Sequence, residues 1–314
     1  MKKRGRKKLK QKLNKIVKKT KRNVFVVIVF IIGLVLFGLL ASLIYLIKTQ
    51  PVIYISSLTP RQGETILIKV SGNRPELSGY FDQQKLVFFK TSNSSSKISL
   101  LGIDADLTPG KHQIVLNLSP TEKEAREIDV QPSNYRSANI SGNSKLNSKG
   151  YTKQVIFDNV VNNDNPVLSK IMENSNPQAY FSQPFTYPLS NIQTSGFEFG
   201  IFVGAVGYMQ HFGVDLAAKK DTEVFAINDG RVVLAENLSN YGKTIIIDHG
   251  LGIFSLYLHL DNFDVSVDQL VKNGQKIGLS GDTGASTGPH LHFSIRNSGS
   301  RVDPLLFIQT ASSI

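Results

Sequence analysis

A run of 24 residues without a charged side chain, Val24 to Ile47, most constrains how this chain can fold. As an α-helix the run would be about 36 Å long at about 1.5 Å per residue, enough to cross a hydrocarbon core about 30 Å thick. A cleaved signal peptide has a shorter apolar region that ends in a small-residue site, and Leu43–Ile47 offers no such site. The sequence therefore predicts a retained transmembrane helix at 24–47.

The positive charge of the chain is concentrated in front of this run. The formal net charge is +12, but 13 of the 36 Lys and Arg residues lie within 1–22, which contains no acidic residue. Because the rest of the chain is close to neutral, nucleic-acid binding is not expected. The Lys/Arg excess places 1–23 in the cytoplasm and 48–314 outside the membrane. The basic segment could adhere to an anionic leaflet, and a cytoplasmic protein partner is the alternative.

Residues 51–131 have the pattern of a small β-sandwich. Short apolar or alternating runs are separated by turn residues such as Gly72-Asn73 and Pro109-Gly110. The runs are 52–55, 65–70, 85–89 and 112–118. Their spacing favours an immunoglobulin-like sandwich. Since no group of His, Asp or Glu marks a site there, we expect a spacer or docking module, with His112 an ordinary surface or strand residue.

Residues 132–183 form a predicted linker that is rich in Asn, Ser and Lys. Within it, 133–150 has the composition of a flexible connector. Pro166 is followed by Val167, Leu168, Ile171 and Met172, which predicts one short helix with proline in its first turn. This helix could pack on the neighbouring domain or line a groove.

Residues 184–310 form the predicted catalytic domain, a mostly antiparallel β structure with short strands and glycine turns. Strands are expected at 223–227, 231–235, 244–248 and 253–259. Five of the six histidines lie between positions 211 and 292. The chain has no cysteine, so a metal in this domain must be held by nitrogen and oxygen atoms.

Two motifs in this domain could supply those atoms. His290 and His292 stand two apart at the start of a predicted strand, so their side chains point to one face. His211 and Asp215 are four apart, but the intervening glycine and valine argue for an extended or turned backbone instead of a helix. Zinc accepts neutral imidazole nitrogen and carboxylate oxygen. Together with His259, the two motifs predict a metal site that neither motif would predict alone.

The run from 211 to 304 resembles the lysostaphin-type zinc metallopeptidase domain. The shared motifs are H-x-x-x-D at 211–215, Gly-Lys-Thr-Ile-Ile-Ile-Asp-His-Gly at 242–250, Tyr-x-His-Leu at 257–260, Val-x-x-Gly-Gln-x-Ile-Gly at 271–278 and Ser-Thr-Gly-Pro-His-Leu-His-Phe at 286–293. The chain departs from the family at Ser195–Gly200. The family usually has Ser-x-Phe-Gly-x-Arg there, and this chain lacks the arginine. That departure puts the groove wall and the substrate preference in doubt.

The resemblance implies that His211, Asp215 and His292 bind Zn²⁺ and that His259 and His290 are catalytic residues facing the open coordination position. Three protein ligands leave that position to water, whose pKa zinc lowers toward about 7. Either His259 or His290 could be the general base, and the sequence does not choose between them. His249 lies in a matching turn but outside the family's ligand set, so we expect it to be structural.

The expected function is zinc-dependent endopeptidase activity on cross-links or stem peptides of peptidoglycan, outside the cytoplasmic membrane. The expected partners are the peptidoglycan peptide and the lipid bilayer; divisome or other envelope proteins are further possible partners whose identity the sequence does not give. One alternative is a non-enzymatic regulator or activator of other wall hydrolases, as some relatives are. Such relatives typically lack the zinc ligands that this chain has. A phosphocarrier or lipoyl-like module is a second alternative, but an outward-facing domain could not reach cytoplasmic phosphoryl donors.

Overall fold

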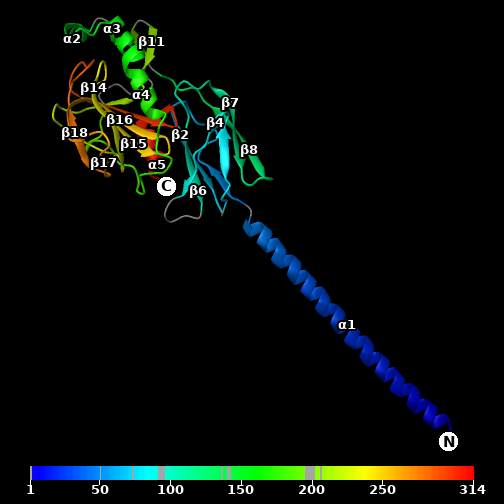
Figure 1. The fold of residues 1–314 in the computed structure, drawn as a ribbon. Coiled ribbons are helices and arrows are strands. Elements are labelled where there is room, and N and C mark those ends of the chain that lie inside the picture. The colour runs from blue at the N-terminus through cyan, green and yellow to red at the C-terminus, as the bar shows by residue number, and fades with distance from the viewer. Residues whose placement is uncertain are drawn as a thin grey trace. The chain divides into compact units, whose positions relative to one another are not determined.

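The structure is a computed structural model that describes the chain except for residues 1, 50, 73, 91–95, 136, 140–142, 195–201 and 206. It divides into two compact units, Met1–Pro51 and Val52–Ile314 (Figure 1). The departure from the family motif at Ser195–Gly200 lies outside the described residues, as does Asn73 of the predicted Gly-Asn turn. The fold class is confirmed: an N-terminal apolar helix is followed by mostly antiparallel β structure.

The first unit is a single helix, α1 (Lys2–Thr49). Residues 12–42 contain a stretch long and apolar enough to cross a membrane. Large side chains along it are exposed, as with Phe30 at 67% and Phe37 at 71%. Soluble surfaces rarely expose so much continuous apolar area, so this stretch fits a lipid environment better than water. The basic and apolar segments predicted separately are one unbroken helix.

The second unit begins with two four-stranded antiparallel sheets, ordered β1-β2-β6-β5 and β4-β3-β7-β8. The strands are β1 (Ile53–Ile55), β2 (Thr65–Val70), β3 (Ser78–Phe81), β4 (Gln84–Lys85), β5 (Phe89–Lys90), β6 (Lys97–Gly102), β7 (Gly110–Asn117) and β8 (Lys123–Val130). Alternate residues of facing strands, such as Ile66, Ile68, Ile114 and Leu116, form the apolar core between the sheets. This arrangement is a sandwich of two sheets, as predicted.

The predicted strand at 85–89 is wrong, because the chain crosses there from one sheet to the other. Its first residue belongs to β4 and its last to β5, which lie in different sheets. Leu86 is buried in the core between the sheets, whereas Val87 and Phe89 pack against a second core. A continuous apolar run can thus serve two cores without forming one strand.

That second core lies on the outer face of the β1-β2-β6-β5 sheet and is shared with the C-terminal half. Leu67, Ile98 and Leu100 project from β2 and β6 into one cluster with Phe185 and Phe307. Burial on both faces explains why β2 is apolar at successive positions instead of alternating. The domain boundaries at 131 and 183 remain predictions, and Val52–Ile314 is one compact unit.

The predicted linker contains four helical turns or helices in its described part: α2 (Ser144–Ser148), α3 (Lys153–Asp158), the π-helix η1 (Asn159–Asp164) and α4 (Asn165–Met172). Helix α4 is the helix predicted from Pro166, and its proline lies in the first turn. Leu168 of α4 is buried in a cluster with Ile246 and Leu256. Residues 144–172 are therefore packed against the following sheet. A short strand, β9 (Ser137–Asn139), pairs with the hairpin that precedes His211.

The C-terminal half is built on a nine-stranded antiparallel sheet whose main order is β12-β19-β16-β15-β14-β17. The elements are the hairpin β10 (Phe202–Ala205) and β11 (Gly207–Gln210), then β12 (Val214–Leu216), β13 (Glu223–Phe225), β14 (Gly230–Leu238), β15 (Gly242–Gly250), β16 (Ile253–Phe263), β17 (Leu270–Val271), β18 (Lys276–Ser280), β19 (Leu291–Asn297), β20 (Ser300–Val302) and helix α5 (Pro304–Ala311). On β16, Tyr257 faces the shared core and Leu258 faces α4. His292 lies directly opposite Leu258 on β19 and so shares the face that α4 covers.

Candidate metal centre

Two neighbouring strands and the loop before them bring His211, Asp215 and His292 together. Asp215 on β12 is directly opposite His292 on β19, so the two side chains leave the sheet side by side. His211 lies three residues before the start of β12 and turns its ring edge-on to His292, with ring centroids 4.6 Å apart. The antiparallel register therefore joins two motifs that are about 80 residues apart in the sequence.

Three ligand atoms converge at this point. His211 Nε2 lies 3.1 Å from Asp215 Oδ1 and 2.9 Å from His292 Nδ1, and His292 Nδ1 lies 2.9 Å from Asp215 Oδ1. In a tetrahedral zinc site with bonds of about 2.0–2.1 Å, ligand atoms are about 3.3 Å apart. The set of two imidazole nitrogens and one carboxylate oxygen therefore fits a zinc ion in both chemistry and spacing.

The protonation states of these groups also suit metal binding. Burial alone would raise the pKa of Asp215, but hydrogen bonds and charge interactions with His211 and His292 hold this pKa well below its ordinary value. Burial, reinforced by His211, lowers the pKa of His292 to about 4. At neutral pH the site thus offers an ionised carboxylate and a neutral imidazole, which are the forms that bind zinc.

Ser294 fixes which nitrogen of His292 faces the site. The Ser294 hydroxyl donates to the carbonyl oxygen of Phe212 at 2.8 Å, so its oxygen is left to accept from His292 Nε2–H at 3.0 Å. That arrangement keeps the proton on Nε2 and the lone pair on Nδ1, directed at the ligand cluster. Ser294 was not predicted from the sequence, although its place two residues after His292 on a strand indicates that it shares the face of His292.

Gly213 lets the chain pass close to this cluster. A Cβ at this position would lie 2.4 Å from Ser294 Oγ and 2.5 Å from His292 Nε2. No side chain fits there without moving the ligand and the hydroxyl that orients it. The glycine between His211 and Asp215 is therefore part of the site.

His259 reaches the metal face because its backbone is left-handed. Tyr257 and Leu260 both face the shared core, so regular alternation is interrupted between them. His259 has φ of +60°, and this conformation turns its ring toward His290 and His292, at centroid distances of 5.0 and 6.1 Å. A register shift after Leu260 accompanies the turn. Such irregularities in strands often re-aim a side chain at a functional site.

His259 and His290, which are outside the proposed ligand set, are each held through the same ring nitrogen, Nδ1. His259 Nδ1–H donates to the carbonyl oxygen of Thr283, and His290 Nδ1–H donates to that of Gly288, both at 2.8 Å. Each neutral ring therefore has its lone pair on Nε2. His290 Nε2 is 3.6 Å from Asp215 Oδ1. Burial, followed by the charges of His290 and His292, lowers the pKa of His259 to about 3.

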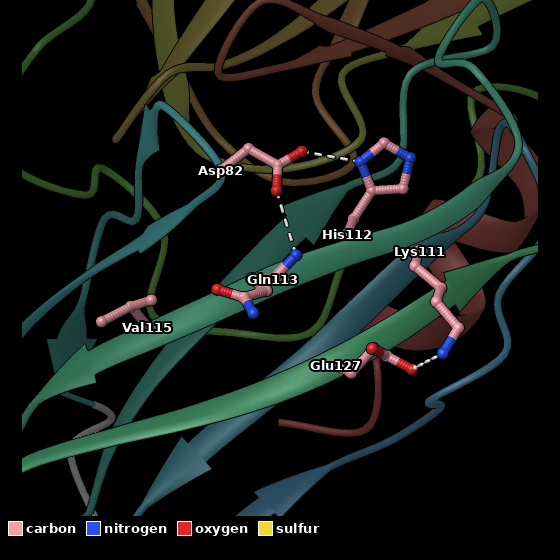
Figure 2. Close-up of a pocket in the computed structure, with 6 residues that line it drawn as sticks. All are labelled: Asp82, Lys111, His112, Gln113, Val115 and Glu127. Atoms are coloured by element: carbon pink, nitrogen blue, oxygen red, sulfur yellow. Dashed lines mark hydrogen bonds and ion pairs between the residues drawn. The ribbon is translucent and has the colours of Figure 1, made fainter.

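The remaining histidines are engaged elsewhere. His249 is fully buried, with Nδ1 against the carbonyl oxygen of Asp229 and Nε2 against Ser255 Oγ, both at 2.8 Å. His112 lines a pocket of about 370 Å³ on the sandwich and bonds through Nδ1 to Asp82, as Figure 2 shows. Its Nε2 bonds to the carbonyl oxygen of Thr108 at 2.8 Å. Both ring nitrogens of His112 are therefore engaged by oxygen atoms of the sandwich and not by the candidate metal centre.

Comparison with known proteins identifies a family for the part of the chain that contains the candidate metal centre. Residues 209–304 match the family described as Peptidase family M23. These residues form a lysostaphin-type M23 domain. The M23 match contains Asp215 and five of the six histidines discussed above; the sixth, His112, lies in the sandwich.

Relatives of the M23 domain include both enzymes and activators. Peptidoglycan DD-endopeptidase ShyA of Vibrio cholerae is 41% identical over 105 residues, which are 33% of this chain and 24% of that protein. Murein hydrolase activator EnvC of Escherichia coli is 42% identical over 98 residues, 31% of this chain and 23% of that protein. The chain thus spans about a quarter of the length of the relatives it matches.

One solved structure shares the fold over more of the chain. A crystal structure described as a putative peptidase M23 from Pseudomonas aeruginosa aligns with a TM-score of 0.55 and 22% identity. The alignment covers 80% of this chain and 96% of that one. Because the coverage extends well beyond the M23 domain, the arrangement of sandwich and peptidase fold is found in another protein.

Proposed function

We propose that this chain is a zinc-dependent endopeptidase that hydrolyses peptide bonds in peptidoglycan, either cross-links or stem peptides. The observation that carries the proposal is the convergence of His211 Nε2, Asp215 Oδ1 and His292 Nδ1 beside two further histidines that are not needed as ligands. A purely structural zinc site would be closed by a fourth protein ligand, whereas three ligands beside free imidazole edges suit catalysis.

The roles follow from chemistry. A zinc ion held by His211, Asp215 and His292 would supply a polarised water and a Lewis acid for the scissile carbonyl. The Nε2 lone pairs of His259 and His290 can each accept a proton from a nucleophile or, once protonated, donate to an oxyanion or leaving amine. Their shared orientation leaves the division of roles between them open.

The alternative, a non-enzymatic activator of wall hydrolases, is supported by the names of relatives such as EnvC. ShyA, at nearly the same identity, is named as an endopeptidase, so similarity alone does not choose. The intact ligand set and its oriented histidines favour the enzyme.

A place outside the cytoplasmic membrane suits this substrate. Helix α1 would act as a single-pass anchor with its basic N-terminal segment in the cytoplasm and the M23 domain outside. Peptidoglycan peptide would then be the polymer within reach of the domain.

The test uses the full-length chain in detergent, loaded with zinc and incubated with purified peptidoglycan. We expect release of new amino termini by the wild type and by His112→Ala, whose residue lies on the sandwich, but none by His211→Ala. Equal release by His211→Ala, or none by zinc-loaded wild type, would contradict the proposal. Stimulation of a separate wall hydrolase by an inactive wild type would favour the activator.

A further inference from the structure

The carboxylate of Asp164 is buried against a loop of the M23 domain although it lies 45 residues before that domain begins. Asp164 is 1% exposed and accepts three backbone N–H groups. The donors are Ser239 at 2.9 Å, Asn240 at 2.7 Å and Tyr241 at 3.2 Å. Burying a carboxylate is costly unless strong hydrogen bonds replace its water, and this cluster supplies them.

The loop held by Asp164 supports His259. The carbonyl oxygen of Tyr241 accepts the backbone N–H of His259 at 3.0 Å. The carbonyl oxygen of Asn240 accepts the N–H of Ala285, in the same loop as Thr283, whose carbonyl accepts His259 Nδ1–H. Both the backbone and the ring of His259 are therefore fixed through neighbours of the 239–241 loop.

His259 needs such support because of its conformation. A left-handed backbone at a residue other than glycine costs about 1–2 kcal/mol and persists only where its surroundings enforce it. If the carbonyl of Tyr241 moved, the chain at His259 could relax toward an ordinary strand, which would swing the ring away from His290 and His292.

The helical segment makes a second contact with the same loop. The side chain of Asn240 is 3% exposed and its Nδ2 donates to the carbonyl oxygen of Ile156 at 2.8 Å. Ile156 lies in α3, which ends at Asp158, directly before the π-helix η1 that ends at Asp164. A π-helical turn inside a helix is rare and often marks a functional position. Here the π-helix η1 joins the Ile156 carbonyl, which contacts Asn240, to the Asp164 carboxylate, which contacts the backbone of 239–241.

We infer that Asp164 is a positioning residue for catalysis, which holds His259 in its left-handed, site-facing conformation through the 239–241 loop. The inference rests on the proposed function of His259. It makes Asp164, which lies outside the M23 match, a working part of the catalytic unit.

The test compares Asp164→Asn with wild type in the zinc-loaded full-length chain. The amide cannot accept three N–H groups as the carboxylate does, so the loop should loosen. We expect the amide hydrogen of His259 to exchange at least about 10-fold faster, while that of His292 keeps its wild-type rate. Zinc stoichiometry should stay at the wild-type value, since the hydrogen bonds described above for the backbone of the 239–241 loop go to Asp164, His259 and Ala285 and not to the three proposed ligands. The kcat for peptidoglycan should fall about 10- to 100-fold with KM within about 2-fold, as for a displaced catalytic group.

Asp158→Asn is the matched control, because Asp158 bonds only within its own helix, to Gln154, among the contacts described. It should leave exchange and kcat at wild-type values. Circular dichroism verifies folding; if Asp164→Asn fails to fold, Asp164→Glu, which keeps the charge but displaces it, should show the same selective change. Unchanged exchange at His259, an equal change at His292, or loss of zinc would overturn the inference. The exchange result holds whether or not the wild type cleaves peptidoglycan, so failure of the proposed function would be seen separately.

Discussion

The surroundings of His249 and His112 shift the pKa values of the two imidazoles in opposite directions. Full burial lowers the pKa of His249 to about 4 despite its hydrogen bond to the carbonyl of Asp229. Burial also lowers the pKa of His112, but its bonds to Asp82 and Thr108 outweigh this and leave the pKa raised. An ordinary histidine has a pKa near 6.5, so the two respond in opposite ways to acid.

The pH dependence of stability should reveal His249. Because its pKa is lower in the folded than in the unfolded chain, its contribution is complete above about pH 6.5 and is lost as pH falls toward about 4. The loss should approach about 3 kcal/mol at full protonation. Urea unfolding of the metal-free chain between pH 7 and 4.5 measures it.

The variant His249→Asn is the comparison for this measurement. This variant should be less stable than wild type at pH 7. Its free energy of unfolding should also depend less steeply on pH, by the contribution of about one proton. A slope identical to wild type would contradict the assignment.

Gly213 gives a second prediction at the scale of single residues. Gly213→Ala should displace His292 and Ser294, because the new Cβ would fall within 2.5 Å of both side chains. We expect zinc affinity to fall by about 10- to 100-fold, comparable to loss of a residue that orients a ligand. Zinc titration with a competing chelator measures it.

Gly288→Ala provides the control for the glycine prediction. Gly288 is also close to a site histidine, but a Cβ there would meet no atom within 4 Å. The zinc affinity of Gly288→Ala should match that of wild type. An equal loss of zinc affinity in both variants would mean that loop flexibility, and not the room for a Cβ at Gly213, decides binding.

The sequence predicted which side chains would be brought together but not how each is aimed. The spacing of His290 and His292, with the H-x-x-x-D motif, was enough to name the cluster. The orientation of His259 depends on one left-handed backbone position inside a strand, and nothing in Tyr257–Leu260 marks it locally. Asp164 was missed because its partners are backbone N–H groups of a distant loop, which leave no trace in residue type.

Among the elements, α4 illustrates how a helix too short to be stable alone is fixed by packing. Eight residues are too few for an isolated helix in water. Leu168, Ile171 and Met172 instead pack on Ile246 and Leu256 of the sheet. The sequence predicted this helix from its proline and apolar spacing, but not the helical turns before it, where the Asn- and Lys-rich composition indicated a linker.

Removing the main apolar contact of α4 should therefore destabilise the unit. Leu168→Ala is expected to lower the free energy of unfolding by about 2–3 kcal/mol, because Leu168 is 5% exposed. Val167→Ala, next to it but 36% exposed, should cost less than about 1 kcal/mol. Chemical denaturation of both variants measures this difference, and equal values would show that α4 does not depend on its apolar face.

For the whole molecule, an ion pair ties the sandwich to the M23 domain. Asp104 accepts from Arg301 Nη2 at 2.6 Å, from Nε at 3.1 Å and from the backbone N–H at 2.7 Å. The same guanidinium lies over the ring of Phe212, 4.1 Å from its centroid, and Phe212 follows the proposed ligand His211 directly in the chain. The interface therefore reaches the edge of the metal centre.

Asp104→Ala should destabilise Val52–Ile314 as a whole. We expect a loss of about 2–3 kcal/mol, because the partly buried guanidinium loses its main partner, and a single calorimetric transition, because the core is shared. Asp106→Ala removes a more exposed carboxylate from the same arginine and should cost less than about 1 kcal/mol. Two separate transitions in wild type would contradict a shared core.

Burial of the β1-β2-β6-β5 sheet on both faces also determines whether proteolysis could release the M23 domain. A cut in the chain between β8 and the M23 domain would break the backbone but leave both faces of β2 and β6 buried. Ile66 and Leu101 would stay in the core between the two sheets, and Leu67, Ile98 and Leu100 would stay packed in the cluster with Phe307. Both fragments would stay attached to each other and, through the first, to whatever holds α1. Clipping the connector would thus not set the peptidase half free to diffuse.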